Sequence, residues 1–145
     1  MKQKIQIRCK NNKKSQKVEI GSTLFDVFSS FDLKMTHGPV SARVNNKVEG
    51  MHYRVYNSKD VEFLDMNSAS GSRAYTRTLF FVLCKAVQDI YPNTDVVIDI
   101  PVSNGFYVDI RLGRPVVDED VNILRRRMQE IIDSKMPIRR FTVPT

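Results

Sequence analysis

The feature that constrains the fold most is the order of strand-type and helix-type periodicity in the first 65 residues. Apolar and polar residues alternate in Lys4–Cys9 and again in Lys17–Ile20, which is the period of a half-buried strand. The polar tract Lys10–Gln16 separates the two patterns. These residues therefore predict an antiparallel hairpin with a basic tip.

A short helix and two further strands are expected after this hairpin. Gly21–Thr23 breaks the second strand and offers hydroxyls that can cap a helix ending near Asp32. Strand patterns follow at Val40–Val44 and Val61–Leu64, with a tight turn at Asn45-Asn46. One helix crossing a small mixed sheet in this order is a β-grasp fold, a type of small binding module.

The uncharged stretch Asn67–Ser72 consists of small and polar residues and is interpreted as a linker. Beyond it, Arg73–Tyr91 carries one apolar stripe at helical spacing and stops at Pro92. The sequence thus predicts an α+β protein of two small domains, residues 1–66 and residues 67–145.

The second domain is expected to continue with a hairpin, a helix and the beginning of a strand. Strand patterns at Asp95–Ile100 and Phe106–Ile110 flank the turn Asn104-Gly105. The last helix begins at Asp118-Glu119-Asp120, three carboxylates interpreted as a solvated cap at the positive end of the helix dipole. A strand is predicted at Ile138–Val143.

The net charge of +7 raises the question of nucleic-acid binding, since clustered cations gain affinity by releasing counterions from phosphates. Residues 1–66 carry 12 basic and 7 acidic side chains, so most of the excess lies in the first domain. The candidate phosphate or RNA contacts are Lys10, Lys13 and Lys14 at the hairpin tip and Arg125, Arg126 and Arg127, which we expect to fan outward from the last helix. A solvated loop and a charged helix face are the alternatives at these two places.

No catalytic or metal-binding set stands out in the sequence. The histidines His37 and His52 lie in loop-like segments, and the cysteines Cys9 and Cys84 lack metal-type spacing. No glycine belongs to a phosphate-binding loop of the G-x-x-x-x-G-K-[ST] type. We expect neither a catalytic residue nor a metal ligand in this chain.

Two stretches in the first domain carry a resemblance to a known family. Glu19–Phe28 reads EIGSTLFDVF and Val40–Val48 reads VSARVNNKV. These resemble the helix start and the strand-turn motif of TGS domains, which are ubiquitin-like β-grasp modules. Asn46 stands where that family usually has glycine, and asparagine can adopt the left-handed conformation that such a turn needs.

The second domain resembles the opening of the editing domain, also called the second additional domain, of threonyl- and alanyl-tRNA synthetases. Three landmarks carry the resemblance: Ile90–Pro92, Ile100–Asp109 with its NGFYVD string, and Asp118–Met128. A TGS domain directly before such a domain is the order found in threonyl-tRNA synthetases. The resemblance implies an editing-like region whose remaining half lies beyond residue 145.

The resemblance also implies that the editing chemistry is lost. That family presents two histidines one helical turn apart, and Arg77 and Phe81 occupy the corresponding places here. A guanidinium does not deprotonate near neutral pH and a phenyl ring has no lone pair. A vestigial cleft is therefore expected, lined by Arg77, Phe81, Asn104, Phe106 and Tyr107.

The main functional hypothesis is a non-catalytic accessory or regulatory region of a nucleoside (uridine) kinase, a family similar to this chain in its TGS and histidine-free editing-like domains. Its P-loop kinase domain would lie beyond residue 145 and would use ATP or GTP with magnesium, while the chain itself would hold no cofactor. The alternatives are the N-terminal tRNA-binding region of a threonyl-tRNA synthetase or its paralogue, and a protein-interaction module. Expected partners are the rest of the same chain and RNA or a nucleotide.

The expected location is the cytoplasm, without a membrane partner, because the longest uncharged apolar-rich run, Thr78–Cys84, is too short to span a bilayer. The N-terminal residues lead into no signal-peptide core. The sequence predicts no oligomeric state.

Overall fold

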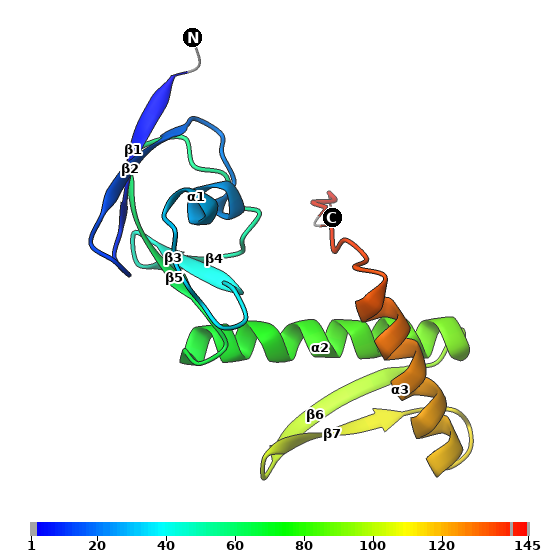
Figure 1. Cartoon of the computed structure of the whole chain (residues 1–145). Helices are drawn as coiled ribbons and strands as arrows, with labels where there is room; N and C mark the ends of the chain where they lie inside the picture. The colour runs from blue at the N-terminus through cyan, green and yellow to red at the C-terminus, as the bar shows by residue number, and fades with distance from the viewer. Residues whose placement is uncertain (1–2, 140, 145) are drawn as a thin grey trace. The chain divides into compact units, whose positions relative to one another are not determined.

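The first unit of the protein is a five-stranded sheet with one short helix. The computed structural model describes residues 3–139 and 141–144 and divides the chain into two compact units, Met1–Arg77 and Thr78–Thr145. In the first unit the elements are β1 (Lys4–Cys9), β2 (Ser15–Glu19), α1 (Leu24–Ser30), β3 (Ser41–Val44), β4 (Lys47–Glu49), β5 (Lys59–Leu64) and the first turns of α2 (Ala69–Ile90) (Figure 1). These elements confirm the predicted α+β class.

The sheet of the first unit has the mixed topology expected of a β-grasp fold. Its strand order is β2-β1-β5-β3-β4, with β1 parallel to β5 and every other neighbouring pair antiparallel. The β1–β2 hairpin is confirmed. Strand β4 was not predicted, because Lys47–Glu49 contains one apolar residue and so has no alternation to detect.

The inward side chains of this sheet and of α1 form one apolar core. Ile7, Leu24, Val27 and Val61 are fully buried in it. Burying an aliphatic side chain of this size contributes about 1.5–3 kcal/mol. Phe28 packs edge-to-face on Phe63 with ring centroids 5.1 Å apart.

Two short polar motifs set the boundaries of these elements. The backbone N–H of Asp26 donates to the Thr23 hydroxyl (3.3 Å), and the Thr23 N–H donates to the Asp26 carboxylate (2.8 Å), so a capping box begins α1 as the hydroxyls predicted. Asn45 and Asn46 have φ of 44° and 71°, which confirms that asparagine can hold the left-handed turn between β3 and β4.

The second unit packs two helices and a hairpin around a smaller core. Its elements are the C-terminal part of α2, β6 (Val96–Val102), β7 (Gly105–Ile110) and α3 (Asp118–Asp133). Figure 1 shows α3 crossing α2, and the two helices share the buried residues Ala86, Val87, Leu124 and Ile131. Val96 and Ile110 of the hairpin pack against the same cluster.

The predicted linker at Asn67–Ser72 is wrong for its second part, because α2 begins at Ala69. The Ser68 hydroxyl accepts a hydrogen bond from the Gly71 N–H (3.0 Å) and donates to the Asp65 carbonyl (2.9 Å). A serine in this place satisfies one of the unpaired N–H groups at the start of a helix. The small residues therefore cap α2 and do not form a flexible connection.

The strand predicted at Ile138–Val143 is also wrong for the residues that can be judged. Residues 138, 139 and 141–143 have no strand conformation, and Arg140 lies outside the described residues. An apolar alternation forms a strand only when another strand satisfies its backbone groups. The domain boundary between residues 66 and 67 stays a prediction, because the two units divide within the continuous helix α2.

Replacing Gly71 by alanine is expected to destabilise the first unit. A Cβ added at Gly71 would lie 1.7 Å from the Asp65 carbonyl oxygen, so the helix start must move away from the end of β5. Overpacking of this kind costs about 1–3 kcal/mol. Chemical denaturation followed by circular dichroism measures the loss.

Gly50→Ala is the matched control for this substitution, because a Cβ at Gly50 meets no atom within 4 Å. Equal unfolding free energies for the two variants would contradict the packing described at Gly71.

Candidate functional site

Of the five residues expected to line the vestigial cleft, four lie at two places in the second unit, and Arg77 lies at the end of the first unit. Asn104 is in the turn between β6 and β7, and Phe106 and Tyr107 follow it in β7 with 45% and 58% of their surface exposed. The Phe106 ring packs edge-to-face on Phe80 of α2, with centroids 4.9 Å apart. The hairpin tip therefore contacts the residue before Phe81.

Arg77 and Phe81 lie one helical turn apart on α2, as the resemblance implied. Both are exposed, and Phe81 is 64% exposed. Successive residues of an α-helix point about 100° apart, so Phe81 and the Phe80–Phe106 contact occupy different sides of α2. Arg77 is the last residue of the first unit. The role of the five residues as a cleft stays a prediction.

Phe81 lines an apolar groove that the sequence did not indicate. The groove encloses about 380 Å³ between α2 and the end of α3, and its lining includes Val82, Ile131, Met136 and Ile138. Lys85, Lys135 and Arg139 add positive charge to this lining. Residues 136–139 follow α3 without helical or strand conformation, so periodicity could not have placed them there.

Asp120, predicted to be a solvated cap, is buried in an ionic cluster. Its carboxylate accepts two hydrogen bonds from the Arg114 guanidinium (2.7 and 2.8 Å), one from the Tyr91 hydroxyl (2.6 Å) and one from the Val117 N–H (3.0 Å). Only 3% of the residue is exposed. The bonds from Arg114, with those from Tyr91 and Val117, hold the pKa of Asp120 well below its ordinary value.

This cluster joins three separate segments of the second unit. Tyr91 directly follows α2, Arg114 lies in the connection after β7, and Asp120 is in the first turn of α3. Four accepted bonds leave the carboxylate no capacity for a substrate or metal. The cluster is structural. Its members Tyr91 and Asp120 belong to two of the sequence landmarks named above, Ile90–Pro92 and Asp118–Met128.

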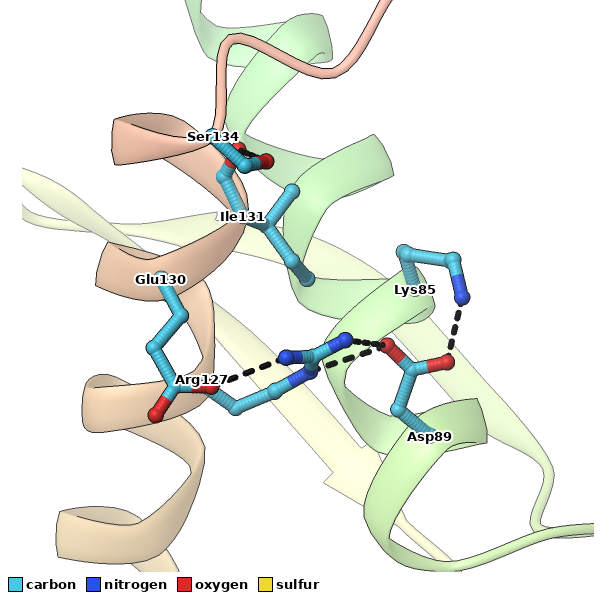
Figure 2. A network of polar contacts seen from close by, with 6 residues as sticks. All are labelled: Lys85, Asp89, Arg127, Glu130, Ile131 and Ser134. Carbon is cyan, nitrogen blue, oxygen red and sulfur yellow. Dashed lines mark hydrogen bonds and ion pairs between the residues drawn. The ribbon is translucent and has the colours of Figure 1, made fainter.

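Arg127 is paired within the protein and does not point freely outward as expected. Figure 2 shows its guanidinium between Asp89 of α2 and Glu130 of α3, with nitrogen–oxygen distances of 2.8 Å to each. Lys85 pairs with the same Asp89 carboxylate. Bonds from Lys85 and then Arg127 lower the pKa of Asp89, so the carboxylate remains ionised at neutral pH.

The other predicted basic contacts are exposed. Arg125 and Arg126 lie on the solvent side of α3, and Lys10, Lys13 and Lys14 lie at the tip of the β1–β2 hairpin. The Lys10 ammonium donates to the Asn46 side chain at 3.4 Å. These five residues form two separate basic groups, one in each unit.

A polar pocket on the first unit was also missed. It encloses about 310 Å³ and is lined by Gln6, Arg8, Ser15, Asn45, Ser58, Lys59 and Asp60. Its residues come from β1, β2, the β3–β4 turn and the start of β5. The sequence feature that could have indicated this pocket is the pair of polar residues in the alternating pattern of β1, Gln6 and Arg8.

Metal and membrane features can be assessed for the part of the chain that the structure describes. Within residues 3–139 and 141–144, no group of three or more His, Cys, Asp or Glu is placed to hold a metal ion. In the same residues, no helix combines the length and apolar character needed to cross a membrane. His37 and His52 are both exposed, and the His52 ring packs on Phe25.

Comparison with known proteins finds threonine–tRNA ligases among the relatives of this chain. No family model matches the chain. The chain is 29% identical to the threonine–tRNA ligase of Natranaerobius thermophilus over 125 residues, which is 86% of this chain and 20% of the ligase. For the ligase of Clostridium perfringens (strain ATCC 13124) the identity is 28% over 129 residues, and for that of Acetivibrio thermocellus it is 28% over 124 residues.

The chain spans about a fifth of the length of these curated relatives. It is homologous to a region of threonyl-tRNA synthetases. This result confirms the synthetase-like part of the sequence interpretation. The relatives named here favour the synthetase alternative over the nucleoside kinase hypothesis, which they do not support.

Replacing Asp120 by asparagine is expected to lower the stability of the second unit at neutral pH, since an amide cannot pair with Arg114 as an anion. A carboxylate whose pKa is depressed by folding contributes stability above its unfolded-state pKa, close to the ordinary 3.8, and loses it as pH falls through the folded value. The difference from the unsubstituted protein should therefore shrink below about pH 4. Urea denaturation across this pH range measures it.

Asp118→Asn is the control, because Asp118 is an exposed carboxylate in the same first turn of α3. The account of the cluster fails if Asp118→Asn and Asp120→Asn destabilise the protein equally.

Proposed function

We propose that this chain is a non-catalytic RNA-binding region related to the N-terminal tRNA-binding region of threonyl-tRNA synthetases. The similarity to threonine–tRNA ligases over 84–89% of the chain is the observation that carries this proposal. Both units of the structure fall largely within a match of that extent. The TGS-like and editing-like assignments of the two halves belong to the same proposal.

Charge supports RNA as the partner. The chain has a net charge of +7, and the exposed pair Arg125 and Arg126 is not engaged with Asp89, unlike Arg127. Exposed guanidinium groups bind phosphate oxygens and gain free energy from released counterions. Arg127 instead holds α3 against α2, which places its two neighbours on the outer side of the helix.

The proposal excludes hydrolysis by this chain. Arg77 and Phe81 offer no nitrogen that could accept a proton from water near neutral pH. Two acidic groups near α2 are already engaged, since Asp89 pairs with Arg127 and Lys85, and Asp120 pairs with Arg114. The region would hold RNA without cleaving its aminoacyl ester.

Transfer RNA is expected to bind the chain with strong salt dependence. Affinity measured by fluorescence anisotropy should fall steeply between about 50 and about 200 mM salt. Arg125→Ala/Arg126→Ala should weaken binding and reduce the salt slope by about 1 for each phosphate that the variant no longer neutralises.

The control Lys34→Ala/Lys47→Ala removes the same charge from exposed positions of the first unit. Absence of tRNA binding at low salt would refute the proposed function. An equal loss of affinity in both double variants would refute the assignment to Arg125 and Arg126.

The chain is expected to leave threonine-specific tRNA mischarged with serine intact. Deacylation followed with radiolabelled serine should proceed at the rate of the protein-free reaction, because the helix lacks a proton acceptor at residues 77 and 81. A working editing enzyme provides the positive control. Metal-dependent deacylation by this chain would show that another residue supplies the base.

A further inference from the structure

The polar pocket of the first unit combines groups of opposite charge on the solvent face of the sheet. Gln6 and Arg8 alternate with the half-buried Ile5 and the buried Ile7 and Cys9, so they point away from the core. Parallel pairing of β1 with β5 places Arg8 beside Asp60. Asp60 completes the charged part of a pocket of about 310 Å³, and Lys59 joins the lining from the position paired with the buried Ile7.

The charged side chains of this pocket have no partner within the described part of the protein. Across residues 3–139 and 141–144, no hydrogen bond or ion pair engages the side chain of Arg8, Lys59 or Asp60. Among the described residues, Asp60 contacts Asn45 through its backbone. Its N–H donates to the Asn45 side-chain oxygen and its carbonyl accepts from the Asn45 N–H, both at 3.0 Å. Removing its carboxylate would leave that pairing in place.

The neutral groups of the pocket are oriented by backbone contacts. The Asn45 side-chain oxygen accepts from the Asp60 N–H, which leaves its amide N–H groups to donate elsewhere. The Ser58 hydroxyl accepts from the Gln6 N–H (3.3 Å), which leaves its own proton to donate. The pocket thus offers the Arg8 cation, several neutral donors and one carboxylate acceptor.

We propose that this pocket binds one ribose-phosphodiester unit of single-stranded RNA, an inference that rests on the proposed RNA-binding function. Arg8 and the neutral donors of Asn45 and Ser58 hold the phosphate, and Asp60 accepts a hydrogen bond from the ribose 2′-hydroxyl. A phosphodiester brings a charge of −1, which is the smaller charge that a nucleotide phosphate can place near Asp60. A nucleoside monophosphate dianion would instead leave excess negative charge beside Asp60.

The lining also indicates how the RNA is read. The seven lining residues include no aromatic ring, so a base has nothing to stack on in this pocket. Phosphate contacts give position without sequence information, whereas the 2′-hydroxyl distinguishes RNA from DNA. The pocket therefore selects RNA over DNA and is indifferent to base sequence.

The test compares single-stranded RNA and DNA oligonucleotides of the same mixed sequence, bound to the full chain at low salt. The unsubstituted protein should bind RNA about two- to tenfold more tightly than DNA, the worth of one hydrogen bond. Arg8→Ala should weaken binding of both oligonucleotides. Asp60→Ala should abolish the preference for RNA without weakening binding of DNA, because it removes a negative charge near the phosphate.

Lys34→Ala is the matched control for Arg8→Ala, since it removes one exposed positive charge outside the pocket. Thermal unfolding of each variant verifies that the substitutions leave the fold intact. An unchanged RNA preference in Asp60→Ala, or equal effects of Arg8→Ala and Lys34→Ala, overturns this assignment while the proposed function stands.

Two further outcomes separate the sources of the ligand. Complete displacement of the RNA by an equal concentration of nucleoside monophosphate would assign the pocket to a free nucleotide and overturn the RNA proposal. A protein that binds neither transfer RNA nor the RNA oligonucleotide would overturn the pocket assignment together with the proposed function.

Discussion

The parallel pairing of β1 with β5 is the interaction on which the first unit depends. It joins segments about 50 residues apart and places β1 at the interior of the sheet, between β2 and β5. The Asn11 side chain extends this pairing beyond the end of β1 by bonding both the N–H (2.8 Å) and the carbonyl (2.9 Å) of Phe63. The same register sets Arg8 beside Asp60, so the sheet topology that closes the core also builds the polar pocket on the opposite face.

In the second unit, ion pairs decide which charges remain available to a partner. Arg127 and Arg114 each bind carboxylates from a neighbouring segment, and they join α3 to the end of α2 and to the connection after β7. Arg125 and Arg126 remain on the outer side of α3. A basic run of three arginines therefore divides into one residue that stabilises the packing of two helices and two residues that can meet phosphate.

Local patterns predicted the fold well where a short range of chain contains all the information. Alternation located β1, hydroxyls located the start of α1, and asparagine located the β3–β4 turn. One error arose because small residues can form either a linker or a helix cap, as at Ser68. The other arose because a strand needs a distant partner, as at residues 138–143. The sequence predicted correctly that Arg125 and Arg126 are exposed, while their contact with phosphate stays a prediction. It could not assign Arg127 to Asp89, since 38 residues separate them.

The amino-acid sequence by itself determined that an arginine and a phenylalanine, without an imidazole, stand at residues 77 and 81, and this fact does not depend on how the chain folds. It also determined the elements whose periodicity is local. Only the tertiary structure decided which charges are neutralised and which are gathered into a pocket, because electrostatic and hydrogen-bonded partners are chosen by distance in space. Arg8 and Asp60 are 52 positions apart in the chain and neighbours in the sheet, and no spacing rule could have brought them together.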